Sequence, residues 1–319
     1  MSTYRHLFGP VHSRRLGLSL GIDLVPWKTC SFDCVFCQAG RTTVHTLDRR
    51  AYVPIAEIAQ EFGRWQTEDG RADHITLAGS GEPTLHTRFG DVLDMVRGCC
   101  RIPTVLMTNS SLFSLPEVRA AACRADTVKA SLSAWDQASF EQVNRPPPEL
   151  GFARVLGGLR DFRNAYAGRL WIEVFLVDGV NDRPADVVRI ATLVQSLHPE
   201  CVHLNTVVRP PAEADAHAVP AARLQALAAL FTPAGEVVAS PPLHEQVQAT
   251  ARADEPAGAS AMSDEALLSL IRRHPCSLPQ LAEAAGSPVD AMEARMARLV
   301  SSGVARAEVI GGVRWYATR

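Results

Sequence analysis

The residues with the clearest chemical potential are three cysteines, Cys30, Cys34 and Cys37, which follow the spacing Cys-x3-Cys-x2-Cys. Three thiolates this close together can hold three corners of an iron–sulfur cubane. A 4Fe–4S cluster that only transfers electrons takes four cysteine ligands, so a set of three leaves one iron open to an exogenous ligand. The run therefore predicts a 4Fe–4S cluster with an open iron. A structural zinc site, with His45 as its fourth ligand, is the alternative.

An aromatic residue, Phe36, stands directly before the last of these cysteines. The pattern resembles the signature of the radical S-adenosylmethionine superfamily, and the resemblance extends over residues 8–243. It implies that S-adenosylmethionine chelates the open iron and that Phe36 belongs to its site. It also implies that an electron from the cluster cleaves the sulfonium and releases a 5′-deoxyadenosyl radical, which abstracts hydrogen from a substrate.

A second motif, Gly79-Ser80-Gly81-Glu82, follows the second expected strand. It resembles the Gly-Gly-Glu motif of the same superfamily, with Ser80 in place of the commoner second glycine. Small adjacent residues let backbone carbonyls approach a ligand ammonium closely. The resemblance therefore places all four residues in the S-adenosylmethionine site. A simple glycine-rich turn, with a local structural role for Glu82, is the alternative.

Polar side chains mark the expected strands further along the chain. Lys129, Ser131 and Ser133 alternate, so they project to one face. Glu173 lies between apolar neighbours, and a buried carboxylate needs a partner. The candidates to hydrogen-bond the cofactor from these strands are Asn109, Ser131, Ser133, Glu173 and Asn205. The catalytic residue is unknown, with Lys129, Arg145 and Arg209 as candidates, and a solvent-facing or capping role is the alternative for each residue.

The elements that must position these groups are alternating strand and helix patterns over residues 18–231. Strands are expected at Leu18–Val25, His74–Ala78, Thr104–Thr108, Thr127–Leu132, Leu170–Val177 and Val202–Val207. Helices are expected at Pro54–Trp65, Phe89–Cys99, Pro116–Cys123, Phe152–Tyr166, Pro184–Leu197 and Pro220–Phe231. Such a series predicts an α/β fold with a parallel sheet and right-handed crossovers. The superfamily resemblance selects a partial (β/α)6 TIM-like barrel over an open sheet.

The chain of 319 residues is long enough for one large domain and one small domain. Residues 1–243 are expected to form the barrel, and the polar, Ala/Gly-rich residues 244–262 a linker. Residues 263–319 carry three helical patterns, Asp264–His274, Leu278–Ala285 and Pro288–Ser302, and then two strands around Gly311-Gly312. This order is typical of a winged-helix domain.

The stretch from Phe8 to Asp23, together with Pro26-Trp27-Lys28-Thr29-Cys30, resembles one subgroup of Fe–S oxidoreductases. That subgroup is related to wyosine-synthesising tRNA enzymes, which use a Schiff-base lysine and a second cluster. The sequence departs from them on both points. Its only lysines are Lys28 and Lys129, and its other cysteines are scattered: Cys99, Cys100, Cys123, Cys201 and Cys276.

The charge of the chain bears on its partners. The formal net charge is −2, with 24 basic and 25 acidic residues in 1–243. A nucleic-acid binder is expected to carry a basic surface. The third helix of the C-terminal domain begins with Asp290 and Glu293, which oppose phosphate contact. Nucleic acid is therefore not favoured, and a protein or peptide partner, or packing between domains, is the preferred role of this domain.

Two classes of function remain open at this stage. The first is an enzyme that uses the radical on an RNA base, a peptide, a protein or a metabolite. It requires an electron donor such as flavodoxin or ferredoxin. The second is an Fe–S redox regulator that binds DNA through the winged helix. The sequence contains no stretch long and apolar enough to cross a membrane, which predicts a cytoplasmic protein.

Overall fold

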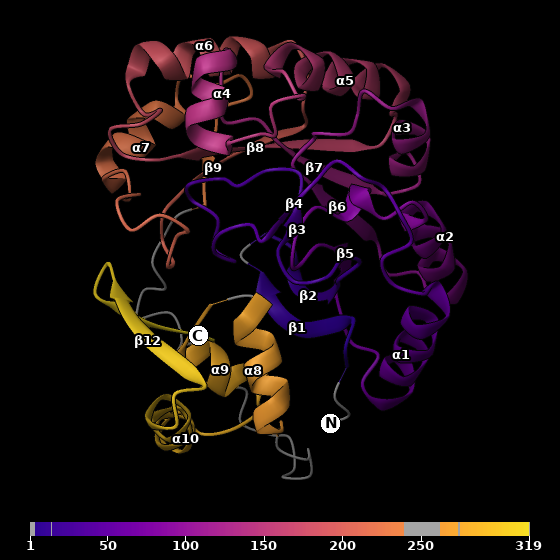
Figure 1. Ribbon diagram of the computed structural model, residues 1–319, viewed down its shortest axis with the longest axis vertical. Coiled ribbons are helices and arrows are strands. Elements are labelled where there is room, and N and C mark those ends of the chain that lie inside the picture. Colours follow the sequence, from indigo (N-terminus) through magenta and orange to yellow (C-terminus); the bar gives the residue numbers. More distant parts are fainter. Residues whose placement is uncertain (1–3, 14, 239–261, 274, 319) are drawn as a thin grey trace.

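The computed structural model describes residues 4–13, 15–238, 262–273 and 275–318 (Figure 1). Its main domain is an eight-stranded sheet in the order β1-β2-β5-β6-β7-β8-β9-β10. The strands are β1 (Leu7–Ser13), β2 (Gly17–Ile22), β5 (His74–Leu77), β6 (Thr104–Thr108), β7 (Thr127–Ser131), β8 (Arg169–Leu176), β9 (Cys201–Thr206) and β10 (Glu236–Val237). Each neighbouring pair from β2 to β10 is parallel. The carboxyl ends of these parallel strands therefore meet at one edge of the sheet.

Helices cover the outer side of the curved sheet and form an arc in Figure 1. They are α1 (Ile55–Glu68), α2 (Phe89–Cys99), α3 (Pro116–Ala122), α4 (Gln137–Asn144), α5 (Phe152–Ala165), α6 (Pro184–Gln195) and α7 (Ala221–Ala228). Helix α2 shows why they pack there. Phe89, Val92, Leu93 and Val96 recur at helical spacing and are fully buried. The expected α/β fold is confirmed.

Three elements of the main domain differ from expectation. Strand β1 runs antiparallel to β2, so the sheet is mixed and not wholly parallel. Its pattern is interrupted by Gly9-Pro10 beside a register shift between Phe8 and Val11, and proline rarely stands within a strand. Strand β10 has two residues, too few for an alternating pattern. Helix α4 has eight residues and begins at a capping box made by Asp136 and Ser139.

Short elements hold the loop that contains the cysteines. Strands β3 (Thr29–Cys30) and β4 (Val44–His45) form a separate parallel ladder. The carbonyl of Lys28 accepts hydrogen bonds from the backbone N–H groups of Thr43 and Val44. The 3-10 helix η1 (Pro83–Leu85) follows the glycine-rich turn. These contacts fix both ends of the cysteine loop.

The C-terminal domain has a core of its own. It comprises α8 (Asp264–Arg273), β11 (Cys276–Ser277), α9 (Leu278–Ala284), α10 (Val289–Ser301), β12 (Ala305–Ile310) and β13 (Val313–Thr318). The three helices and the hairpin occur in the expected order, and β11 adds a third strand. Met262, expected in the linker, is buried in this core, while residues 244–261 of the expected linker lie outside the described residues. Helices α8 and α9 contact β1, beside which the domain lies in Figure 1.

None of the described helices has the length and hydropathy needed to cross a bilayer.

Candidate active site

Each cysteine of the loop has a nitrogen donor beside its sulfur. Asn109 Nδ2 lies 3.6 Å from Sγ of Cys30, and Asn144 Nδ2 lies 3.3 Å from Sγ of Cys34. Lys28 Nζ lies 3.2 Å from Sγ of Cys37. Nitrogen donors and positive charge stabilise thiolates and tune the potential of a bound cluster. The three sulfurs therefore lie in surroundings suited to metal-bound thiolates.

Burial raises the pKa of the Cys30 thiol to about 12, with further contributions from neighbouring charges including Glu82. Burial also raises the pKa of Cys34. A metal that coordinates such a thiol displaces its proton. Without a metal these two thiols are therefore protonated at neutral pH, and metal binding would release their protons.

The position of His45 bears on the zinc alternative. Ligands of one tetrahedral zinc ion, with Zn–S near 2.3 Å, lie ~3.8 Å apart. Within the described part of the chain, Cys30, Cys34, Cys37 and His45 form no group of three whose ligand atoms all lie within 4.8 Å. His45 Nε2 instead hydrogen-bonds the carbonyl of Ser31 at 3.1 Å. The His45 ring is thus engaged by the backbone and is not gathered with the cysteines, which argues against a zinc site with His45 as the fourth ligand.

The glycine-rich turn packs directly against this loop. Gly79 has φ +136°, a conformation that L side chains rarely adopt, and a Cβ on Gly81 would lie 1.7 Å from the carbonyl oxygen of Thr29. The carbonyl of Ser80 accepts a hydrogen bond from the Lys28 backbone N–H at 2.9 Å. The backbone N–H and hydroxyl of Ser80 donate to Asp23. Only very small residues permit this close approach.

Glu82 holds the turn to strand β6. Its carboxylate accepts hydrogen bonds from Thr84, from the hydroxyl of Thr108 at 2.6 Å and from the backbone N–H of Asn109 at 2.7 Å. Burial raises the pKa of Glu82, although these hydrogen bonds oppose the rise. Both carboxylate oxygens are used within the protein. The contacts therefore support the local structural role of Glu82 and not contact with the cofactor.

A cavity of about 370 Å³ lies beside the cysteine loop. Its lining includes many of the residues singled out from the sequence: Phe36, Cys37, Gly79, Lys129, Glu173, Asn205 and Arg209. The ring of Phe36 stacks on Phe175, with centroids 4.0 Å apart. Arg273 and Gln280 of the C-terminal domain also line the cavity. The fold thus brings one cysteine of the loop, the turn and the strand-borne polar groups around one space.

A buried ionic group occupies the wall of this cavity. The carboxylate of Glu173 pairs with Lys129 and with Arg15, whose Nη1 lies 3.1 Å away, and it accepts a hydrogen bond from Asn205 at 3.3 Å. Burial alone would raise the pKa of Glu173. The two cations outweigh burial and hold the pKa well below its usual range. The predicted partner of Glu173 is thereby confirmed as a pair of cations.

Other predicted residues lie outside the cavity. The hydroxyl of Ser133 accepts a hydrogen bond from the backbone N–H of Phe175 and is buried, which fits a structural role. The carbonyl of Ser131 accepts a hydrogen bond from the hydroxyl of Ser110, and Ser131 does not line the cavity. Arg145 pairs with Glu213, and neither residue lines the cavity, so its candidacy as a catalytic residue is not supported.

Several contacts of the site have only weak signals in the sequence. Asn144, which contacts Cys34, directly precedes Arg145, one of the candidate catalytic residues. Lys28 stands out only as one of two lysines and as a neighbour of the cysteine run. Nothing local in the sequence pairs Asp23 with Arg273, whose Nε and Oδ2 atoms lie 2.8 Å apart. That ion pair joins the end of β2 to the C-terminal domain.

The Arg273→Met variant is expected to loosen the C-terminal domain. Asp23 is almost fully buried, so loss of its cation leaves an uncompensated charge and should cost about 3 kcal/mol of unfolding free energy. Denaturant unfolding gives that cost, and hydrogen exchange should show faster exchange in α8. The exposed Arg298→Met serves as the control. Unchanged unfolding and unchanged exchange in Arg273→Met would show that the ion pair does not anchor the domain.

The Gly81→Ala variant is expected to displace the turn from the cysteine loop. A methyl group 1.7 Å from a backbone oxygen cannot be accommodated without backbone movement, and such overpacking costs about 1–3 kcal/mol. The affinity for S-adenosylmethionine, measured by equilibrium dialysis, should fall because the turn has moved. Gly98→Ala in α2 is the matched control because its Cβ meets nothing within 4 Å. Equal affinity and stability in the two variants would contradict the close packing.

The chain matches a known protein family. The model of the radical SAM superfamily matches residues 24–191, so the chain belongs to that superfamily. Enzymes of this superfamily use a 4Fe–4S cluster and S-adenosylmethionine. Cys30, Cys34 and Cys37 all fall within the matched residues.

Individual relatives match large parts of the chain. A Methanocaldococcus jannaschii protein named UPF0026 protein MJ1312 is 35% identical over 210 residues, covering 65% of this chain and 64% of that protein. A Brachyspira hyodysenteriae protein named GTPase Obg is 30% identical over 314 residues, covering 98% of this chain and 45% of that protein. The chain thus spans less than two thirds of the length of either relative.

The fold has a counterpart among solved structures. A radical SAM methyltransferase from Sphaerobacter thermophilus superposes with a TM-score of 0.51 and 20% identity. The superposition covers 69% of this chain and 65% of that one. At this identity the likeness concerns the fold alone, and it supports the partial barrel.

Proposed function

We propose that this protein is a radical S-adenosylmethionine oxidoreductase that reductively cleaves its cofactor and abstracts hydrogen from a substrate. The observation that carries the proposal is the common cavity of Cys37, Gly79 and the Lys129–Glu173 pair. The bound cluster and S-adenosylmethionine would together supply an electron to the sulfonium and yield a 5′-deoxyadenosyl radical. The chain itself supplies the ligands, the cofactor pocket and the exclusion of water.

The residues around the cavity have distinct roles in this proposal. Cys30, Cys34 and Cys37 would hold three irons. Gly79, which lines the cavity, would present its backbone carbonyl to the amino group of the cofactor, while the Ser80 carbonyl holds the turn to Lys28. Phe36, Asn205 and the Glu173 group would line the rest of its site, with Phe36 offering an apolar face. Asn109 is better suited to support Cys30, to which it donates.

The substrate class remains an RNA base, a peptide, a protein or a metabolite. Wyosine-type imine chemistry needs a lysine amine that is free to react. Lys28 donates to Cys37, and Lys129 is paired with Glu173. Both amines are thus engaged, which supports a reaction other than imine formation. Of the three candidate catalytic residues, Arg209 remains for substrate contact. It lines the cavity and donates to Gln38.

The partners follow from the same proposal. The cluster needs an electron donor such as flavodoxin or ferredoxin, and we place the protein in the cytoplasm with it. Helices α8 and α9 of the winged-helix-like domain pack on β1, and Arg273 reaches the cavity. These contacts support interdomain packing as the main role of that domain. The acidic start of α10 favours a protein or peptide as any further partner over nucleic acid.

Production of 5′-deoxyadenosine tests the proposal. Anaerobically reconstituted protein, given dithionite and S-adenosylmethionine, is expected to release 5′-deoxyadenosine, measured by mass spectrometry. Candidate RNAs, peptides and cell extract should increase the yield when one of them contains the substrate. Cluster-loaded protein that releases none under all these conditions would contradict the proposal. Redox-dependent DNA binding without cleavage would favour the regulator instead.

A further inference from the structure

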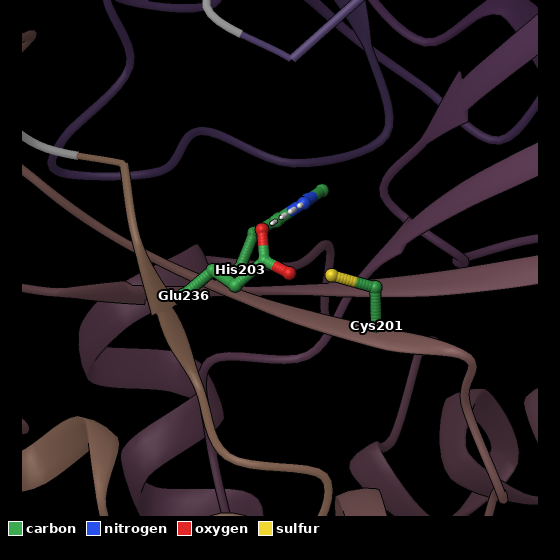
Figure 2. Close-up of side chains that lie close together, drawn as sticks. All are labelled: Cys201, His203 and Glu236. Carbon is green, nitrogen blue, oxygen red and sulfur yellow. Dashed lines mark ion pairs between the residues drawn. The ribbon is translucent and has the colours of Figure 1, made fainter.

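A second group of metal-binding side chains lies apart from the cysteine loop. Cys201, His203 and Glu236 each offer one ligand atom, and these atoms all lie within 4.8 Å of one another. Figure 2 shows the side chains converging, Cys201 and His203 from β9 and Glu236 from β10. None of the three lines the cavity beside the cysteine loop. The group therefore adjoins the proposed cofactor site without lining it: His203 stands opposite Glu173 in the pairing of β8 and β9, and Arg15 and Lys129 interact electrostatically with its ring.

The strand register accounts for this convergence. Glu236 stands opposite His203 in the parallel pairing of β9 and β10. Cys201 lies two residues before His203, and residues two apart on a strand project to the same face. The backbone thus fixes the positions of all three side chains, as a metal site requires.

His203 carries unused hydrogen-bonding capacity. His203 is 2% exposed, and its Nδ1 atom has no hydrogen-bond partner among the residues that the structure describes. Its Nε2 atom lies 3.8 Å from Oε2 of Glu236, which is too long for a hydrogen bond. Burying a polar group without a partner costs free energy. A cation bound by Nε2 and the carboxylate would fill the 3.8 Å gap between them, with the ring proton on Nδ1.

We propose that Cys201, His203 and Glu236 bind a divalent transition-metal ion of zinc type. One sulfur, one nitrogen and one oxygen ligand suit Zn²⁺, and three protein ligands leave a fourth position for water. Binding replaces the thiol proton of Cys201 by the metal and releases that proton. Because β10 has only two residues, the ion would also fasten this last strand to β9.

A Cys–His nucleophile is the other chemistry that these residue types suggest. It requires a hydrogen bond between the thiol and the imidazole. Among the described residues His203 Nδ1 has no hydrogen-bond partner, and its Nε2 faces Glu236 at 3.8 Å. The geometry therefore favours metal binding over a Cys–His nucleophile.

Zinc uptake by cluster-loaded protein tests the site. Reconstituted protein is equilibrated anaerobically with ZnCl2 and desalted, and zinc and iron are measured by mass spectrometry. The wild type is expected to retain one zinc per chain. Cys201→Ser, His203→Gln and Glu236→Gln should each lose most of it with iron unchanged. Because iron is measured separately, failure of this site is distinguishable from failure of the proposed function.

A matched control and a spectroscopic readout complete the test. Cys99→Ser removes an exposed cysteine elsewhere and should keep the zinc. Bound Co²⁺ should give a thiolate charge-transfer band that Cys201→Ser abolishes. Glu236 is largely exposed, so Glu236→Gln should fold normally even where His203→Gln does not. The proposal is overturned if the wild type retains no zinc, or if Glu236→Gln or Cys201→Ser retains wild-type zinc.

Discussion

Cys37→Ala is expected to abolish cluster assembly and reduce 5′-deoxyadenosine release to the level seen without protein. Cys37 lines the cavity and would supply one of only three protein ligands to the cluster. Cys37 is partly exposed and lies in a loop, so its truncation removes a ligand without opening a cavity in the core. The barrel should therefore remain folded. Iron and sulfide content, visible absorbance and circular dichroism measure the two parts of this result.

A cysteine outside the loop provides the control for this prediction. Cys99→Ala should assemble the cluster and cleave S-adenosylmethionine as the wild type does, because Cys99 is exposed at the end of α2. Cys34→Ala is expected to behave like Cys37→Ala. Full iron content in a triple Cys30, Cys34 and Cys37 alanine variant would show that the cluster is held elsewhere.

Glu173→Gln is expected to cause the largest loss of stability among single substitutions at the site. The change leaves Lys129 and Arg15 facing one another without the carboxylate that neutralises them. Removing one partner of a buried ion pair typically costs about 3–5 kcal/mol. Anaerobic urea unfolding at neutral pH measures the loss. Glu149→Gln, at an exposed position, is the control, and a substitution of that kind should stay within ~0.5 kcal/mol of the wild type. Equal midpoints for the two variants would contradict a stabilising role for Glu173.

The same pair predicts a pH dependence with a definite sign. The pKa of Glu173 is lower in the folded protein than its unfolded value of about 4.3. Its contribution to stability is therefore complete above that unfolded value and is lost as the pH falls through the folded pKa. The difference in unfolding free energy between wild type and Glu173→Gln should be constant near neutrality and should narrow in acid. A difference that widens in acid would contradict the depressed pKa.

The sequence suggested ligands for the cluster because Cys30, Cys34 and Cys37 are neighbours along the chain. It also predicted most elements of the barrel, since the periodicity of buried residues distinguishes strands from helices. Strand β6 and helix α2 have the expected bounds. The sequence did not predict strand β1 or helix α4. Pro10 interrupts the pattern of β1, and α4 is short. Antiparallel pairing of β1 adds a strand that a series of strand–helix units does not imply.

The sequence by itself determined that three thiols and a glycine-rich turn exist at spacings suited to a cluster and its ligand. Only the tertiary structure decided what surrounds them. The donors to Cys30 and Cys34 lie 79 and 110 positions away along the chain, and Arg273 lies 250 positions from Asp23. Such contacts depend on strand register and on how separate elements pack. Hydrophobic periodicity specifies which face is buried, but it does not specify which polar side chains meet there.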